Sequence, residues 1–349
     1  MSQAAHYFYR NKNLFAMKKI ISLFCSSLLL AVVFISCKKE VTPDPNPTPV
    51  AEDKRASISG FVFSANGVTA LGGVHVYTIG SGTTYTTVTG STGYFLLKVP
   101  AGHYDFNIET GDGSLFQTII SVDVIDNQLM HVPAAETRLD CRGHLAYIPG
   151  AWDKIEAIVH DSLGYDITQI SSTTTSDIDS LEMFDAIFIN CGATDLTDPA
   201  QYTNLSQFVT DGGSLYVSDF AASYLTGIHT GNCVRPLGFI DDSLICSVQS
   251  GPMTMVVGAS IVDPLFQGAM GTNTMNVFYD LGQWEIIQNY NTDFWDVIVS
   301  DATFGALMLR NTTYSSNGGN IYYTTFHNNP NGAIGNDMEN MLQYVILNL

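Results

Sequence analysis

Residues 184–220, FDAIFINCGATDLTDPAQYTNLSQFVTDGGSLYVSDF, decide the fold of the second half of the chain. Residues 186–189 are all apolar, as expected of a strand that is buried on both faces. Thr-Asp-Pro at 197–199 can begin a helix, and Gly-Gly at 212–213 can end it before a strand at 214–217. Two buried strands joined by a helix predict a parallel sheet with a right-handed crossover.

The carboxyl ends of these two strands predict where a ligand site would lie, because ligands bind at that edge of open α/β sheets. Asn190 and Cys191 follow the first strand, and Ser218 and Asp219 follow the second. A later strand at 319–326 ends in a polar loop that contains His327. The candidate ligand-binding residues are Asn190, Cys191, Asp219, His327 and Asn329.

Alternating strands and helices continue on both sides of this stretch and predict a doubly wound α/β domain over residues 141–349. A strand is expected at 144–148, a helix at 152–163 and a second strand at 166–170. Later segments have the pattern of strands, followed by a closing helix. The expected strands are 244–248, 253–257, 284–287, 297–299 and 305–309, residues 263–266 are expected to form a loop, and the helix is expected at 336–349.

Residues 56–133 have a different pattern, with short alternating strands separated by frequent turns. Turn sequences occur at 66–67, 72–73, 91–93 and 100–102. This spacing predicts a β-sandwich, joined to the α/β domain through residues 133–140. The predicted fold class is therefore multidomain, with an N-terminal β-sandwich and a C-terminal doubly wound, flavodoxin-like sheet.

The N-terminal residues 1–37 have the features of an export signal. Met17 precedes two lysines, residues 20–35 are mostly apolar, and Ser36-Cys37 follows. This arrangement resembles a bacterial lipoprotein signal, which implies lipidation of Cys37 and attachment to a membrane of the cell envelope, with the outer membrane as the expected one. Residues 1–16 are expected to be an upstream extension. The proline-rich residues 38–55 predict an extended linker.

Charge and cysteine content limit the partners and the redox chemistry. The 349-residue chain has a net charge of −19, which argues against nucleic-acid binding. An exported location permits disulfides. Cys141, Cys191, Cys233 and Cys246 allow three pairings. The short separation of Cys233 and Cys246 favours a bridge between them, whereas Cys191 is expected to be a buried thiol.

Four motifs in the first domain carry a resemblance to a known family. They are Gly60-Phe61-Val62, LGGVHV at 71–76, GYFLL at 93–97 and VPAGHY at 99–104. Residues 56–132 resemble the carboxypeptidase regulatory-like (transthyretin-like) sandwiches. The resemblance implies a spacer or an interaction module without catalytic activity.

The second domain resembles the class I glutamine amidotransferase-like fold, including its trehalose-utilisation-like branch. The resemblance rests on INCG at 189–192, DGG at 211–213, YTTFH at 323–327 and the terminal helix. It implies a cysteine nucleophile at a sharp turn after a strand, where this chain has Ser218-Asp219, and a carboxylate two residues after the histidine, where it has Asn329. Two of the three triad roles are therefore empty.

These observations predict a non-catalytic envelope lipoprotein whose α/β domain binds carbohydrate or a protein partner, without a cofactor. A degenerate hydrolase that uses Ser218 or Asp219 with His327 is an alternative, and a scaffold in an envelope assembly is a second one. Asp219 could be a metal or ligand carboxylate together with Asp195 or Asp198, but no histidine and aspartate pair has the spacing of a metal site. Helix capping and loop solvation explain these three aspartates more simply. Aromatic residues such as Tyr279, Trp284, Tyr290, Phe294 and Trp295 could line a sugar site, but core positions are favoured.

Overall fold

The computed structural model describes most of the chain after the predicted linker. The described residues are 55–227, 238–241, 243–249, 251, 254–316, 318–328 and 336–349. All of these described residues belong to one compact unit. The predictions for Cys37, Cys233, Asn329 and nearly all of the linker lie outside the described residues. No helix in the described part of the chain has the length and apolarity needed to cross a bilayer.

The first part of the compact unit is a β-sandwich, as the turn spacing predicts. One sheet has the order β4-β1-β7, and the other has the order β3-β2-β5-β6. In β4, Phe95, Leu97 and Val99 are buried while the intervening residues are exposed, which is the period-two pattern of a strand with one face in a core. The strands are β1 (Ala56–Phe61), β2 (His75–Gly80), β3 (Thr83–Val88), β4 (Tyr94–Val99), β5 (Gly102–Glu109), β6 (Gln117–Val124) and β7 (Leu129–His131).

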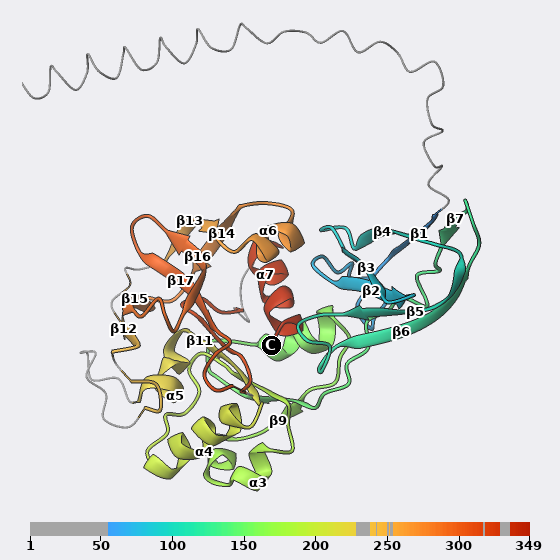
Figure 1. Cartoon of the computed structure of the whole chain (residues 1–349). Coiled ribbons are helices and arrows are strands. Elements are labelled where there is room, and N and C mark those ends of the chain that lie inside the picture. Colours follow the sequence, from blue (N-terminus) through green and yellow to red (C-terminus); the bar gives the residue numbers. More distant parts are fainter. Residues whose placement is uncertain are drawn as a thin grey trace, which may run out of the picture. The chain divides into compact units, whose positions relative to one another are not determined.

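The second part is built on a nine-stranded sheet with the order β14-β13-β16-β17-β18-β11-β10-β8-β9. Figure 1 labels its members β13, β14, β16, β17, β11 and β9. Strands β18, β11, β10, β8 and β9 are mutually parallel, whereas β17, β16, β13 and β14 extend the sheet in antiparallel fashion. The bounds are β8 (Leu145–Ile148), β9 (Thr168–Gln169), β10 (Ala186–Ile189), β11 (Ser214–Ser218), β13 (Met255–Ile261), β14 (Thr274–Tyr279), β16 (Asp296–Asp301), β17 (Gly305–Asn311) and β18 (Ile321–Thr324). A separate pair consists of β12 (Ile245–Gln249) and β15 (Glu285–Tyr290).

Helices cover both faces of the parallel strands, which makes this part doubly wound. Ile187 and Ile189 of β10 share one core with Leu205 of helix α4 (Pro199–Thr210), while Phe188 shares another with Met341 of α7 (Asn336–Leu347). Every residue of β10 and β11 is buried, because both faces are covered. The multidomain β plus α/β class is therefore confirmed, with an antiparallel extension that the sequence did not predict.

Several helices differ from the sequence expectations. Only residues 155–162 of the predicted 152–163 segment are helical, as α2 (Ile155–Ala157) continued by a π-helical turn (Ile158–Ser162). The expected loop at 263–266 is wrong, because helix α6 (Pro264–Met270) begins there. Asp263 accepts hydrogen bonds from the backbone N–H groups of Leu265 and Phe266, at 2.8 and 3.2 Å. The remaining short helices are α3 (Ile178–Leu181) and α5 (Ser223–Thr226).

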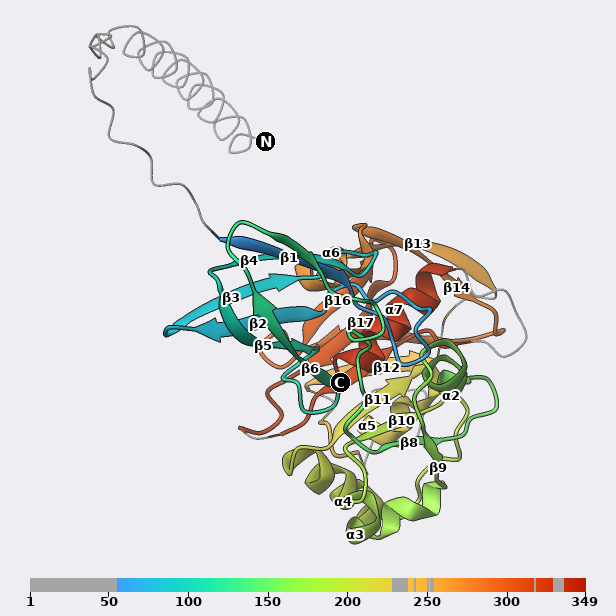
Figure 2. The same cartoon turned by 90° about the vertical axis from the view of Figure 1, so that its right-hand side faces the viewer.

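The sandwich packs directly on the α/β part within the compact unit. Asn66 Nδ2 and Thr69 Oγ1 donate to the carbonyl of Ser162 at 2.7 and 2.6 Å, where the π-helical turn ends. Gly73, with φ +77°, lies so close to Tyr344 of α7 that an added Cβ would be 2.3 Å from its ring. The sandwich strands β1 to β6 and helix α7 are labelled in the view of Figure 2, which is turned by 90° from Figure 1. The sandwich is therefore anchored to the α/β part through close packing at α7.

Candidate functional site

The turn that follows β11 has an unusual backbone conformation at Asp219. The strand ends at Ser218, and a 3₁₀ turn (Asp219–Ala222) leads into α5. Asp219 has φ +45°, and it is one of three non-glycine residues with positive φ in the described part of the chain. Such strain is concentrated at functional sites. Asp219 is thus a carboxylate on a sharp strand-to-helix turn.

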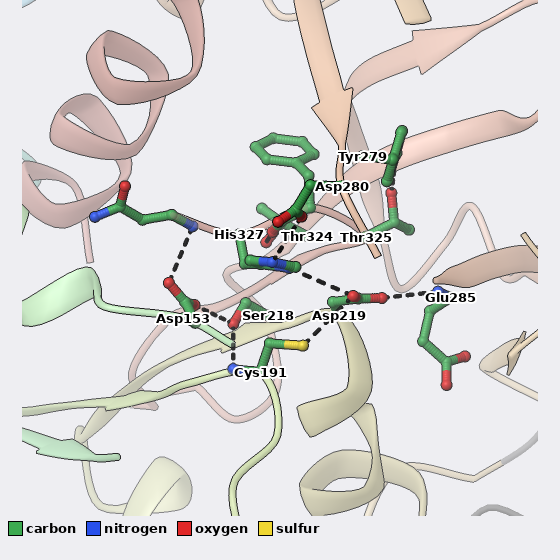
Figure 3. A network of polar contacts seen from close by, with 12 residues as sticks. Asp153, Cys191, Ser218, Asp219, Tyr279, Asp280, Glu285, Thr324, Thr325 and His327 are labelled. Carbon is green, nitrogen blue, oxygen red and sulfur yellow. Dashed lines mark hydrogen bonds and ion pairs between the residues drawn. The ribbon is translucent and has the colours of Figure 1, made fainter. Parts of the chain in front are cut away.

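Three side chains meet beside this turn (Figure 3). The Sγ of Cys191, after β10, lies 3.4 Å from Oδ2 of Asp219. Nδ1 of His327, after β18, lies 3.4 Å from the same oxygen. Cys191 and Asp219 are fully buried, and His327 is 6% exposed. We call Cys191, Asp219 and His327 the edge triad, because they lie at the carboxyl edge of the parallel strands.

His327 lies between two carboxylates. Its Nε2 is 3.4 Å from Oδ1 of Asp280, on the side opposite Asp219. Neither ring nitrogen makes a hydrogen bond of acceptable geometry with any residue that the structure describes. Burial alone lowers the pKa of His327, but contacts with Asp219 and Asp280 outweigh it and raise the pKa well above its ordinary value. The imidazole is therefore held in a buried acidic environment with no ideal hydrogen-bond partner among the described residues.

The Cys191 thiol is not an activated nucleophile in this environment. Burial, followed by the charge of Asp219, raises its pKa to about 12. A reactive cysteine requires a lowered pKa and access to substrate. Burial also raises the pKa of Asp219, which His327 partly offsets. The expectation of a buried thiol at Cys191 is confirmed, although the thiol lies within the candidate site.

A second hydrogen-bonded network lies under the edge triad. Ser218 Oγ donates to Oδ2 of Asp153 at 2.5 Å and accepts from the backbone N–H of Cys191 at 2.9 Å. Oδ1 of Asp153 accepts from the backbone N–H of Asn328 at 2.9 Å. Burial is the main cause that raises the pKa of Asp153 to about 6. No hydrogen bond joins Ser218 to His327 among the described residues, so the serine positions backbone rather than pairing with the imidazole.

The other sequence candidates lie outside the edge triad. Asn190 donates to Oε2 of Glu156 at 2.8 Å, and Asn329 is not described. Asp195 accepts from Ser223 Oγ at 2.7 Å, and Asp198 caps α4 by accepting from the N–H of Ala200 at 2.9 Å. The simpler interpretation is therefore correct for those two aspartates, but it is wrong for Asp219, which is fully buried beside Cys191 and His327.

Two acidic residues at this edge were missed by sequence reasoning. Asp153 follows the predicted strand at 144–148, so its position at the same edge was a usable signal. Asp280 directly follows β14, which was not predicted, and no sequence pattern placed it beside His327. Their proximity depends on the strand order of the sheet.

The aromatic residues proposed as sugar contacts are mainly core. Tyr279, Trp284 and Trp295 are at most 3% exposed, and the first two rings stack at 3.7 Å. Tyr290 and Phe294 are half-buried. The preference for core positions is therefore confirmed for the three buried rings.

A different aromatic pair lies at the carboxyl edge. Trp152, after β8, is 44% exposed and packs edge-on against the half-buried ring of Phe220, with 5.7 Å between the ring centroids. Gly192, with φ +80°, lies under Trp152, where an added Cβ would be 2.5 Å from the indole. The backbone of the loop after β10 thus approaches and supports the tryptophan ring.

The cysteines have two chemical states. Cys246 forms a disulfide, and Cys141 and Cys191 are free thiols. Because Cys233 lies outside the described residues, its predicted pairing with Cys246 stays a prediction. Cys191 therefore keeps its sulfur available as a ligand.

Several solved structures resemble parts of this chain in fold. A ThuA-like protein from Bacteroides uniformis is 10% identical, with a TM-score of 0.39, and the match covers 58% of this chain and 89% of that one. A glutamine amidotransferase from Thermotoga maritima is 8% identical, with a TM-score of 0.35, and the match covers 53% and 75%. A protein from Bacteroides uniformis described as carbohydrate-binding is 20% identical, with a TM-score of 0.20, and the match covers 26% and 44%.

Comparisons of sequence found no match, either to a protein-family model or to a curated protein. The structural similarities concern the fold alone, since sequence identity is low and the TM-scores of these three proteins are all below 0.5. The functional proposals below therefore rest on the residues and distances of the carboxyl edge.

Proposed function

We propose that this chain is a lipid-anchored protein of the cell envelope that binds neutral carbohydrate at the carboxyl edge of its nine-stranded sheet. The observation that carries the proposal is the exposed indole of Trp152, which is supported by Phe220 at that edge. Aromatic faces bury the apolar C–H faces of sugars, and nearby polar groups can bind hydroxyls. Ligands of open α/β sheets bind at this edge.

The low content of charged residues and the acidic net charge favour a neutral ligand. Charged residues make up only 13% of the chain, and the net charge is −19. Anionic glycans would be repelled at long range, whereas neutral sugars would not. We therefore name neutral oligosaccharides as the ligand class.

The burial and the hydrogen bonds of the residues at this edge favour binding over hydrolysis. Asp219 replaces a thiol or hydroxyl nucleophile at the strand-to-helix turn, and it is fully buried. The thiol of Cys191 is protonated near neutral pH because burial raises its pKa to about 12. A hydrolase based on Ser218 would need His327 as its base, yet the serine hydroxyl donates to Asp153 instead. These contacts support the non-catalytic interpretation over the alternative of a degenerate hydrolase.

The proposed location rests on the sequence of the N-terminal segment. Acylation of Cys37 would attach the chain to the membrane, and the proline-rich residues 38–55 would hold the folded unit away from the lipid surface. Mass spectrometry of membrane-extracted protein should find Cys37 acylated and N-terminal. Mature protein that begins at another residue would remove the anchor from the proposal.

Glycan binding is tested by thermal-shift measurements against a panel of neutral and anionic oligosaccharides. A neutral glycan should raise the melting temperature with concentration, because it binds the native state. Trp152→Ala should abolish the shift, and Trp152→Phe should retain part of it. Tyr94→Ala, an exposed aromatic residue of the sandwich, is the matched control and should behave as wild type. The same shift in wild type and Trp152→Ala would refute the assignment.

A protein-binding scaffold is the second candidate, and one surface favours it. Phe61, Tyr94 and Leu96 project from β1 and β4 and are 36–43% exposed, with 5.3 Å between the Phe61 and Tyr94 ring centroids. Exposed apolar residues grouped on one sheet face are typical of interaction sites. Cross-linking in intact cells should capture an envelope protein, and Tyr94→Ala should prevent capture while Trp152→Ala should not. Capture that is unaffected by Tyr94→Ala would exclude this surface.

A further inference from the structure

We propose that Cys191, Asp219 and His327, the edge triad, form a zinc-binding site. This inference is independent of the carbohydrate proposal, because it concerns buried side chains and not the ring of Trp152. The ligand atoms would be Cys191 Sγ, Asp219 Oδ2 and His327 Nδ1. All three residues offer donor atoms within 4.8 Å of one another.

The separations between the donor atoms fit a tetrahedral zinc ion. Zinc bonds of about 2.3 Å to sulfur and about 2.0–2.1 Å to nitrogen or oxygen, at tetrahedral angles, place neighbouring ligand atoms roughly 3.3–3.6 Å apart. Sγ of Cys191 and Nδ1 of His327 each lie 3.4 Å from Oδ2 of Asp219. The distance from Nδ1 to Oδ2 is long for an N–H···O hydrogen bond, whereas the distance from Sγ to Oδ2 is that of a thiol hydrogen bond. Both distances match the edges of a coordination tetrahedron.

The histidine has the orientation of a metal ligand. Nδ1 faces the other two donor atoms, and Nε2 faces Oδ1 of Asp280 at 3.4 Å (Figure 3). A ligating histidine commonly directs its second ring nitrogen to a carboxylate, which fixes the tautomer and the ring orientation. The side chain of His327 is 5% exposed, and its ring nitrogens have no hydrogen bond of acceptable geometry among the described residues. A metal ion would satisfy Nδ1.

The backbone holds the other two ligands in place before any ion binds. The second carboxylate oxygen of Asp219, Oδ1, accepts from the N–H of Glu285 at 2.7 Å, which leaves Oδ2 directed at the triad. The N–H of Cys191 donates to Ser218 Oγ at 2.9 Å. A preformed arrangement of this kind lowers the entropic cost of ion binding. The positive φ of Asp219 contributes to the proposed site, because this backbone conformation directs the carboxylate across the edge of the sheet.

The donor set selects zinc over the commoner divalent cations. Magnesium and calcium take oxygen ligands, and a thiolate does not suit either of them. One sulfur, one nitrogen and one oxygen atom suit zinc. On binding, the Cys191 thiol loses its proton to solvent and coordinates as the thiolate. Three protein donors are one short of four, so a water molecule or another small ligand completes the tetrahedron.

The test measures zinc in the full chain after removal of metal with a chelator, addition of zinc chloride and desalting. The expected result is about one zinc per wild-type chain, a single tetrahedral site, and a large loss of zinc in Cys191→Ser and His327→Gln. Cys141→Ser removes the other free thiol of the described residues and should keep the metal. Zinc that is absent from wild type, or retained equally by all variants as adventitious binding to acidic groups, would overturn the proposal.

Cobalt spectroscopy of the wild-type chain tests the site without any substitution that could impair folding. Tetrahedral Co²⁺ with one thiolate should give intense visible bands and a near-ultraviolet sulfur-to-metal charge-transfer band, and both should disappear when zinc is added. Asp280→Asn, which alters only the residue that orients His327, should weaken the affinity for Co²⁺ roughly 10- to 100-fold while retaining the bands. A weak octahedral spectrum without charge transfer would overturn the assignment.

Discussion

Replacement of Asp153 by Asn should change how stability depends on pH. Burial raises the pKa of the Asp153 carboxyl from 3.8 to about 6 in the folded protein. The folded state therefore binds this proton more tightly than the unfolded state does. Below the unfolded pKa both states are protonated and there is no penalty, whereas above the folded pKa the fold carries the full cost of a buried charge.

The magnitude follows from the size of the shift. A difference of about two pKa units corresponds to about 3 kcal/mol, since each unit is worth about 1.4 kcal/mol. Wild type should lose this much as pH rises from about 4 to above 6, and Asp153→Asn should not. The amide can keep both contacts, by accepting from the N–H of Asn328 through its oxygen and donating to Ser218 through its nitrogen.

Urea unfolding of the metal-free protein at a series of pH values between 4 and 8 measures this effect. The stability of Asp153→Asn relative to wild type should increase by about 3 kcal/mol across the series. Asp179→Asn, at an exposed position of α3, controls for the change in net charge. A difference between Asp153→Asn and wild type that stays constant with pH would show that this carboxyl does not titrate with a raised pKa.

Two further substitutions test packing and capping by thermal or urea denaturation. Asp263→Ala removes the cap of α6 and a carboxylate 3.1 Å from Arg310, so it should lower the free energy of unfolding by about 1–3 kcal/mol. Asp296 also contacts Arg310, but its side chain is 60% exposed. An equal loss of stability in Asp296→Ala would contradict a special role for Asp263. Gly73→Ala should destabilise by more than about 1 kcal/mol, because a Cβ would collide with α7. Gly82→Ala has the same φ of +77° but open space around it, so equal effects at both glycines would show that only backbone strain matters.

The central strands and helix α4 were predictable because their signals are local. Strand β10 is continuously apolar since both of its faces are buried, and α4 begins with Asp198 before a proline. The same capping signal occurs at Asp263, but the seven residues of α6 are too few to show a helical period, so the sequence alone did not predict this helix. The π-helical turn could not be predicted, since residues of the distant sandwich bind the carbonyl of Ser162 where it ends.

The candidate site was predictable only in part. Strand ends placed Cys191 and Asp219 at one edge, because parallel neighbours end at the same edge of a sheet. The position of His327 depends on β18 pairing with β11, which no local pattern reveals. Asp280 lies beside the site because the antiparallel extension brings the end of β14 there. The chemistry of the triad depends on the contact between Asp280 and His327. Non-local strand order therefore decides which polar residues meet.

The most direct test of a built ligand site at the carboxyl edge is anomalous diffraction at the zinc absorption edge from crystals of the zinc-loaded chain. We predict one strong peak within coordination distance, about 2.0–2.3 Å, of Cys191 Sγ, Asp219 Oδ2 and His327 Nδ1. Asp280 should face Nε2 of the same imidazole. Crystals without a peak there, in which the three side chains bond directly to one another, would contradict the proposed zinc site.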